Sequence, residues 1–482
     1  MTLVSTWLNG APETSRPRLV LIACSLGVLL AQIDTSVINL AVKSIGADLH
    51  SGVSAMQWVI DSYNLVYASL LLTGGTLGDL YGRRRLFLLG IALFAVGTLI
   101  CAFAPSTEIL ILGRVVSGLG AAFEVPMSLV LLSVAYPDRK QRAHAMGIWA
   151  SCNGLAFVIG PTVGGWLVDS IGWRSIFFVI LPVCAVALAL TFRAVPESAD
   201  PEGRRLDLPG QGLAIIGLAA FAFAAIEGSN WGWGSAPLLF VLGVAVTALV
   251  AFVWVEKRTE GPLLPLTFLR RPVFSAALAC AGLMTFGMYA LLFLMPLYLQ
   301  TVRGATPFVV GLELLPMSVS FAVVSQLAGH LNNSVGPRLV MTTGMVCMGV
   351  GAMLLAFISQ ATGIGAIEAA LIVVGVGLGL NTAPVNGVAV AAVPAARSGT
   401  ASGMVNTSRM VGATLGVAIL GTVFAAYAGQ AALMGAGFLP GLHAAMSGSA
   451  AAELLGAAIA LAFIRKDSLR RDGDAPCLTR VL

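Results

Sequence analysis

Fourteen apolar segments, each long enough to cross a lipid bilayer, follow one another along this chain of 482 residues. The hydrocarbon core of a bilayer is about 30 Å thick, so a helix needs about 20 apolar residues to cross it. Lipid offers no hydrogen-bond partners, and a helix satisfies its own backbone polar groups within the segment. The sequence therefore predicts an all-α membrane protein.

The apolar segments fall into groups of six, two and six. They lie near 19–42, 55–78, 85–104, 108–134, 142–168, 175–193, 209–227, 237–255, 272–300, 307–332, 338–358, 362–392, 399–427 and 447–464. Polar stretches at 193–207 and 256–271 separate the groups. We predict an N-terminal six-helix bundle (1–193), a two-helix insertion with cytoplasmic linkers (194–271), a C-terminal six-helix bundle (272–464) and a cytoplasmic tail (465–482).

The composition agrees with a membrane protein, because 58% of the residues are hydrophobic and only 10% are charged, against about 25% charged in soluble domains. The net charge of +5 does not indicate nucleic-acid binding, since the basic residues cluster in short loops. Six of the seven cysteines lie in apolar segments without ligand spacing. We expect no disulfide framework and no metal site.

The basic residues predict the orientation. With the N-terminus inside, 22 of the 27 Arg and Lys residues lie in cytoplasmic loops and tails, and the outer loops hold only Lys43, Arg174 and Arg303. Cytoplasmic loops carry the excess of basic residues in membrane proteins. We expect a multi-pass protein of the plasma (inner) membrane with both termini in the cytoplasm.

An internal repeat relates the two groups of six segments. GGTLGDLYGRRRL (74–86) matches AGHLNNSVGPRLV (328–340) at an offset of 254, and GLG recurs at 118–120 and 377–379. A third set of small residues recurs at an offset of 256: Gly147, Ala156 and Gly160 with Gly403, Gly412 and Gly416. Two parallel homologous halves are a transporter architecture, with the substrate site at their interface.

Three ionisable side chains are expected at one depth in the first half. Asp34, Asp61 and Arg114 each lie six to eight residues from the outer end of their segments, which places them ~9–12 Å below the outer surface. Charged residues inside a membrane are costly and usually functional. We interpret the three as a proton-coupling group. The alternative is a static ion pair between Asp34 and Arg114 that fixes helix packing.

Other charged residues in the spans leave more than one interpretation open. Glu124 is a candidate cavity residue, either as a contact for a cation or as a second proton site. Alternatively, its carboxyl group bonds a backbone carbonyl that is freed near Pro126. Arg409 faces the cavity or pairs with a carbonyl or an acid. We expect Glu313 at the membrane interface and Glu453 at the periphery.

Four further stretches have the character of family motifs: GTLGDLYGRRRL (75–86), LGRVVSGLGAA (112–122), GIWASCNGLAFVIGPTVGGWL (147–167) and IDTSVINLAV (33–42). Together they resemble the major facilitator superfamily, and within it the fourteen-span drug–proton antiporters. The chain departs from the family pattern at Leu80, Ala156 and Lys43. The resemblance covers almost the whole chain. It implies the major facilitator fold with two extra central helices, links Arg114 to proton coupling and makes Asn39 a cavity residue.

The resemblance also implies two gating elements. Asp79, Gly82 and Arg83 lie in the loop between the second and third helices, where basic residues anchor the chain to anionic lipid. Asp79 is also a candidate latch for the start of the span near Ser398.

In the fifth helix, Gly147, Ala156, Gly160 and Gly164 predict a small-residue strip on one face. Pro161 allows a bend, and Gly165 completes the motif. Either the strip only packs helices tightly, or it also seals the inner vestibule.

The expected function is proton-coupled efflux of amphiphilic, cationic antimicrobial compounds by alternating access. The chain has no Gly-Lys pair and hence no Walker A loop, so we expect a proton gradient instead of ATP, no cofactor and a monomer in contact with lipid. No HExxH or GxSxG motif indicates an enzyme. The rivals are a dedicated exporter of one antibiotic or metabolite, an uptake or metabolite antiporter, and a non-transporting membrane receptor.

Overall fold

The computed structural model describes residues 17–200, 206–259, 262, 264–394, 397–428 and 437–464. The expected cytoplasmic tail and part of the first linker lie outside the described residues. The described part of the chain is helical and contains no strand.

Fourteen long helices and one short one make up the described residues, in the expected order. They are α2 (Pro17–Asp48), α3 (Val53–Tyr81), α4 (Arg83–Ala102), α5 (Thr107–Ala135), α6 (Arg139–Ser170), α7 (Ser175–Ala194), α8 (Leu208–Trp231), α9 (Ala236–Glu256), the four-residue α10 (Leu266–Leu269), α11 (Pro272–Thr301), α12 (Pro307–Val335), α13 (Pro337–Leu355), α14 (Ile364–Ala391), α15 (Ser398–Ala428) and α16 (Phe438–Phe463).

Thirteen of the described helices are long and apolar enough to cross a membrane by length and composition. The exception among the long helices is α3, which carries Gln57, Asp61, Ser62 and Asn64 in its first half. All four side chains are buried. The all-α membrane fold is confirmed, whereas the count of fourteen spans stays a prediction.

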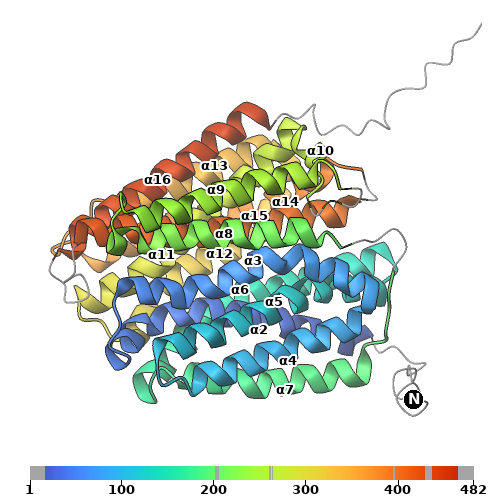
Figure 1. The fold of residues 1–482 in the computed structure, drawn as a ribbon, viewed down its shortest axis with the longest axis horizontal. Coiled ribbons are helices and arrows are strands. Elements are labelled where there is room, and N and C mark those ends of the chain that lie inside the picture. The colour runs from blue at the N-terminus through green and yellow to red at the C-terminus, as the bar shows by residue number, and fades with distance from the viewer. Residues whose placement is uncertain are drawn as a thin grey trace, which may run out of the picture.

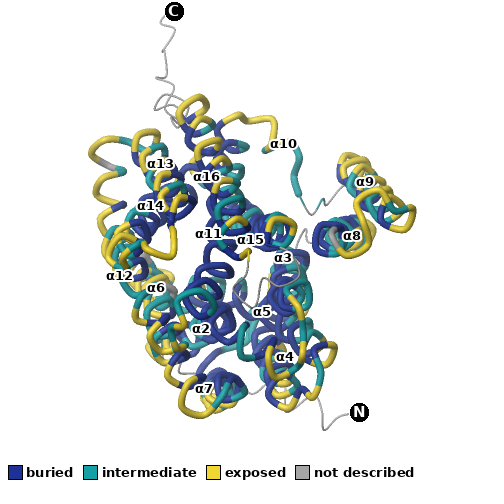
Figure 2. The backbone as a smooth tube through the Cα atoms, turned by 90° about the vertical axis from the view of Figure 1, so that its left-hand side faces the viewer, coloured by how far each residue is buried: buried dark blue, intermediate teal, exposed yellow. Residues whose placement is uncertain are grey.

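The helices run side by side across the molecule (Figure 1), and α2–α7 and α11–α16 form two groups. The groups meet along two seams, one between α6 and α12 and one between α3 and α15, with α2 and α11 in contact between them. Viewed at right angles, α8 and α9 lie outside both groups, with α8 next to α3 and α15 and α9 packed on α8 (Figure 2). The exact boundaries of the predicted parts stay a prediction.

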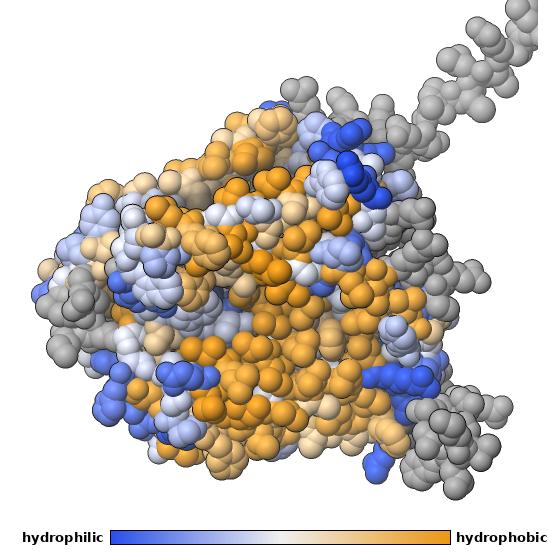
Figure 3. Space-filling view, viewed as in Figure 1, coloured by the Kyte–Doolittle hydropathy of each residue, from blue (hydrophilic) through white to orange (hydrophobic). Residues whose placement is uncertain are grey.

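A wide apolar surface covers the middle of the visible face, and hydrophilic residues gather toward its ends (Figure 3). This is the pattern of a protein that crosses a bilayer. We call the end of the bundle at which α2 begins and α3 ends the terminal end, and the other end the opposite end. The predicted orientation places the terminal end in the cytoplasm.

The internal repeat has a structural counterpart at two turns. Gly82 joins α3 to α4 with φ +112°, and Gly336 joins α12 to α13 with φ +90°. Residues other than glycine rarely adopt a positive φ. The 254-residue offset therefore relates two turns that both need glycine for the same physical reason.

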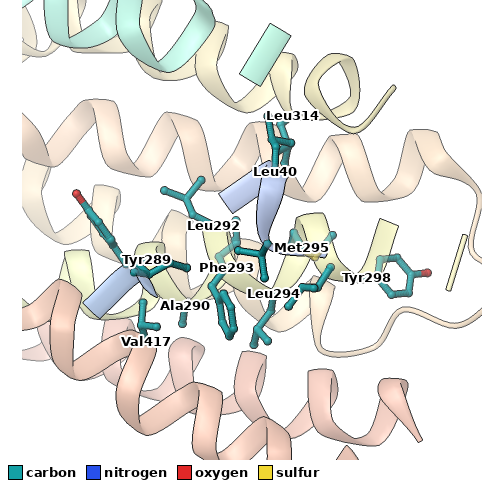
Figure 4. Packing of buried hydrophobic residues seen from close by; sticks show 14 of the residues in the cluster. Leu40, Tyr289, Ala290, Leu292, Phe293, Leu294, Met295, Tyr298, Leu314 and Val417 are labelled. Atoms are coloured by element: carbon teal, nitrogen blue, oxygen red, sulfur yellow. The ribbon is translucent and has the colours of Figure 1, made fainter. Parts of the chain in front are cut away.

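α11 lies at the centre of the apolar core that both halves share. Its Phe293 and Leu294 are fully buried, and they pack in one cluster with Leu40 of α2, Leu314 of α12 and Val417 of α15 (Figure 4). This cluster joins helices from both halves, so it holds the halves together in the state that the structure shows.

Candidate functional site

A buried ion pair joins α2 to α5. Nη1 of Arg114 donates to Oδ2 of Asp34 over 2.5 Å, and only 1% of the Arg114 residue is exposed. Nε of Arg114 donates to the carbonyl of Val59 over 3.0 Å, and its guanidinium lies 4.5 Å from the ring centroid of Tyr63. Three helices of the first half therefore meet at this arginine. Burying such a pair is costly unless its geometry and hydrogen bonds compensate.

Two further acids of the first half are completely enclosed. Asp61 on α3 and Glu124 on α5 are both 0% exposed, and neither carboxyl group has a hydrogen-bond partner among the described residues. Glu124 lies where α5 packs against Gly90 of α4. These side chains belong to the same bundle as the Asp34–Arg114 pair, but no hydrogen bond joins them to it in the described structure.

A narrow cavity lies where the two halves meet. It is lined by Ser36, Asn39, Leu40, Phe157, Pro161, Leu292, Pro296, Leu314, Met317 and Ser318, which come from α2, α6, α11 and α12. Its inner space is about 10 Å³, close to the room that one water molecule needs. None of these ten described lining residues carries a charge. A drug-sized ligand needs several hundred Å³, so the halves must separate further before one can bind here.

Of the three predicted cavity residues, Asn39 lines this space, whereas Glu124 and Arg409 do not. Arg409 on α15 donates from Nη2 to the carbonyl of Thr382 over 2.7 Å, which agrees with the carbonyl-pairing alternative. Glu453 was expected at the periphery, and that expectation is wrong. It is 1% exposed, because the absence of a side chain at Gly287 of α11 leaves room for its carboxyl group.

The predicted gating loop is held from within the first half. Asp79 accepts from Nη2 of Arg83 over 2.7 Å, four residues on. The segment that follows α7 folds over the same turn: the N–H of Arg83 donates to the carbonyl of Ser198 (2.8 Å), and the N–H of Asp200 donates to the carbonyl of Asp79 (2.9 Å). Sequence reasoning treated this segment as a linker and missed its contact with the turn. The latch between Asp79 and α15 stays a prediction.

The small-residue strip of α6 packs mainly on α2. An ideal Cβ at Gly160 would lie 1.9 Å from Oγ of Ser36, and one at Gly164 would lie 2.6 Å from Val37. The carbonyl of Ala156 also lies near Oγ of Ser36, at 3.4 Å. Gly147, expected on the same face, has no other described residue within 4 Å of its Cβ position, apart from its own helix. It lies nine residues before Ala156, about two and a half turns, which places it on the other side of the helix.

The halves also touch closely across α6 and α12 toward the opposite end. A Cβ position at Gly165 of α6 lies 2.4 Å from the carbonyl oxygen of Pro307 in α12. In the reverse direction, one at Gly311 of α12 lies 2.1 Å from the carbonyl oxygen of Pro161 in α6. Glycine at these two places lets the backbones approach each other.

Hydrogen bonds between the halves close the same end. Lys43 of α2 donates from Nζ to the carbonyl of Gln300 on α11 (2.6 Å), and Nε2 of Gln300 donates to the carbonyl of Leu40 (2.9 Å). Asp169 of α6 accepts from the N–H of Phe308 at the start of α12 (3.2 Å). Lys43 had been noted as a basic residue of an outer loop and as a departure from the family pattern, and no sequence signal pointed to Gln300.

Toward the terminal end the same helices diverge. A Cβ position at Gly154 of α6 lies 3.8 Å from Ala322 of α12. Those at Gly147 and Gly329, nearer the terminal end, have no neighbour within 4 Å among the described residues of other helices. The two halves are therefore in close contact at the opposite end, and α6 and α12 lie further apart at the terminal end.

We expect Gly311→Val to hold the opposite end open, because the added side chain collides with the backbone at Pro161. A cysteine placed at Asn39 should then react at least about tenfold faster with a membrane-impermeant thiol reagent added from that side, a shift of about 1.4 kcal/mol in the closing equilibrium. Gly329→Val, on the same helix but with open space around it, is the matched control. Equal labelling of both variants would contradict this role for Gly311.

Two parallel six-helix groups around an interfacial cavity define this molecule as a membrane transporter by class. The family model of the Major Facilitator Superfamily matches residues 24–417. The chain belongs to that superfamily.

Several named proteins are similar to this chain. The multidrug resistance protein Stp of Mycobacterium tuberculosis (strain CDC 1551 / Oshkosh) is 40% identical over 414 residues, which cover 85% of this chain and 76% of that protein. The methylenomycin A resistance protein of Streptomyces coelicolor is 34% identical over 401 residues (83% and 84%). The multidrug efflux pump LfrA of Mycolicibacterium smegmatis is 34% identical over 468 residues (95% and 91%).

Solved structures support the fold. A crystal structure of a bacterial homolog to the human lysosomal transporter Spinster has a TM-score of 0.67 and 20% sequence identity, and the match covers 93% of this chain and 97% of the other.

Proposed function

We propose that this protein exports amphiphilic, cationic antimicrobial compounds across the plasma membrane in exchange for protons. The observation that carries the proposal is the Asp34–Arg114 ion pair buried in the first half. The same bundle encloses Asp61 and Glu124, whose carboxyl groups have no hydrogen-bond partner among the described residues. The names of the relatives support drug efflux. Both termini lie in the cytoplasm, and the protein works as a monomer without cofactor or ATP.

The ion pair gives a physical account of coupling. An ionised Asp34 attracts Arg114 and ties α2 to α5. A proton on Asp34 removes that attraction and leaves Arg114 with the carbonyl of Val59 and the ring of Tyr63. Proton binding thus changes how α2, α3 and α5 are held together, and Asp61 supplies a further carboxyl group for the proton in the same bundle.

Alternating access requires the two ends of the molecule to open in turn. The state described here is closed at the opposite end, which faces outward in the predicted orientation. To release a compound outward, the protein must break the hydrogen bonds that Lys43 and Gln300 donate and that Asp169 accepts, and it must close the terminal end. Asp79, Gly82 and Arg83 would then help to hold the terminal end closed.

Everted membrane vesicles test the function directly. Respiration makes their lumen acidic, so the protein should drive a cationic dye into the vesicles until an uncoupler abolishes the gradient. Vesicles without the protein are the control. Dye uptake that continues after the uncoupler is added, with or without a requirement for ATP, would contradict proton exchange.

Glu124 is expected to matter more for dications than for monocations. Its carboxylate adds a second negative charge near Asp34, and charge attraction is strong in a low-dielectric interior. Glu124→Gln should reduce efflux of a dicationic dye about tenfold and leave that of a monocationic dye within roughly twofold. Glu313→Gln, on the partly exposed start of α12, is the matched control. Equal losses for both dyes would make Glu124 a structural acid.

A dedicated exporter of one compound is the second candidate, because one of the relatives is named for a single antibiotic, methylenomycin A. Efflux measured over a panel of unrelated cationic and neutral compounds separates the two. Transport of one scaffold alone would favour the dedicated exporter.

A further inference from the structure

The helix α8 covers the α3–α15 seam between the two halves. Figure 2 shows α8 beside both helices and α9 outside it. Ala225 and Ile226 of α8 are buried together with Ala418 of α15, and Trp58 of α3 packs against the same cluster. The outer helix α9 exposes large apolar side chains such as Phe240 and Val250, as a lipid-facing helix does. The inserted pair therefore stands between this seam and the bilayer.

Polar contacts fasten α8 to α3 over most of the length of α3. Near the terminal end, Nε2 of Gln211 donates to the carbonyl of Ser69 (2.8 Å), and the hydroxyl of Thr73 donates to Oε1 of the same glutamine. Nearer the opposite end, Nε1 of Trp58 donates to Glu227 (2.9 Å). Gln211 is only 6% exposed. A buried amide that loses such partners is left unsatisfied, which is costly in an apolar environment.

The chain that leads into α8 is fastened to the first half as well. Glu197 accepts from the N–H groups of Arg84 (3.0 Å) and Arg85 (3.2 Å) at the start of α4. Together with the backbone bonds of Ser198 and Asp200 at the α3–α4 turn, this ties residues 197–200 to the first half. Both α8 and the segment that precedes it are thus bonded to the first half.

The contact between α8 and α15 is of a different kind. Among the described residues, one hydrogen bond crosses it, from Oγ1 of Thr422 to the carbonyl of Ala225 (2.6 Å), and Ala225 and Ile226 pack with the apolar side chains of Ala418 and Ile419. A threonine hydroxyl in a helix can bond the carbonyl four residues back instead. This contact can therefore shift along α15 without leaving a buried polar group unsatisfied.

We propose that the α8–α9 hairpin is a fixed part of the first half, and that it seals the α3–α15 seam by sliding along α15 when the halves exchange positions. The proposal rests on alternating access, as in the proposed function. It gives the two inserted helices a role: they keep the seam covered in every state of the transport cycle.

Distances between spin labels at the terminal end test this proposal in the full chain, on a background without the native cysteines. One pair joins α8 to α3 (Leu208→Cys with Tyr81→Cys), and a second joins α8 to α15 (Leu208→Cys with Gly399→Cys). All three positions are exposed. A third pair, Gly147→Cys with Gly329→Cys, reports whether the halves move at all.

Between acidic and alkaline pH, the α8–α3 distance should stay constant within about 2 Å, while the α8–α15 distance shifts by about one helical turn, roughly 5 Å. A moving α8–α3 distance, or a constant α8–α15 distance while the third pair moves, would overturn the proposal and leave the proposed function standing. If the third pair is also constant, both fail.

Two single variants give an independent measurement. Gln211→Leu removes the buried ties to α3, and Thr422→Val removes the single bond to α15. We expect Gln211→Leu to lower gradient-driven efflux at least about fivefold and Thr422→Val to stay within about twofold of the parent, following the cost of unsatisfied buried groups. The reverse order would assign the hairpin to the second half and refute the proposal.

Discussion

Replacing Asp34 by asparagine is expected to reduce gradient-driven efflux to the level of membranes without the protein. Asparagine keeps the shape of the side chain but cannot take up and release a proton. In the structure, the same change leaves the charge of Arg114 buried without its counter-charge, which costs about 3–5 kcal/mol. Efflux must therefore be measured together with the amount of folded protein.

A second variant separates loss of coupling from loss of folding. Asp34→Asn combined with Arg114→Gln removes both charges, so it should recover the folded amount that the single variant loses. It should still fail to pump dye against a gradient, whereas exchange of dye across equilibrated membranes should continue. Parental pumping by either variant at equal protein level would show that the pair only fixes helix packing.

The variant Gly120→Val is expected to prevent accumulation of folded protein. At Gly120, an added Cβ would lie 2.5 Å from the amide nitrogen of Phe94 and 2.6 Å from the carbonyl of Gly90. The same close approach occurs two turns away, where Gly97 faces Gly113. Neither backbone can give way locally, so α4 and α5 must separate. The cost is at least about 3 kcal/mol, the upper part of the usual range for overpacking.

The matched control for this variant is Gly243→Val in α9. That glycine is also helical, but an added Cβ there meets no atom of another described helix within 4 Å. Size-exclusion chromatography of a fluorescent fusion should show a monodisperse peak for the control and little or none for Gly120→Val. Equal peaks would mean that the α4–α5 contact tolerates separation.

The helices were predictable because their signal is local. An uninterrupted apolar stretch reports on lipid through its own composition, and the turn at Gly82 can be identified from the repeat with Gly336. The depth argument placed Asp34 and Arg114 together, and the structure shows them in contact. Depth alone cannot say which way a side chain points. For that reason it did not predict that Asp61 has no bond to the pair.

The contacts between distant helices were not predictable from one sequence. Gln300 bonds the carbonyl of Leu40, and a carbonyl has no sequence signature. Glu453 lies in an ordinary apolar span, and only the facing Gly287 of another helix explains how it fits inside. The misplaced Gly147 has a simpler cause, since nine residues do not bring a helix back to the same face.

The polarity of α3 has a consequence for how the protein is made. Each span leaves the ribosome before its later neighbours exist, and insertion into the membrane depends on the apolar character of the emerging segment. With Gln57, Asp61 and Asn64 near its start, α3 is the long helix of the described structure that falls short on composition. The partners that bury its polar side chains include α5, α8 and α15, all of which are synthesised later. During synthesis, α3 must therefore wait at the translocon or the membrane surface, or enter together with an apolar neighbour such as α4. The polar residues that α3 buries in the finished transporter therefore make the insertion of this helix the difficult step of assembly.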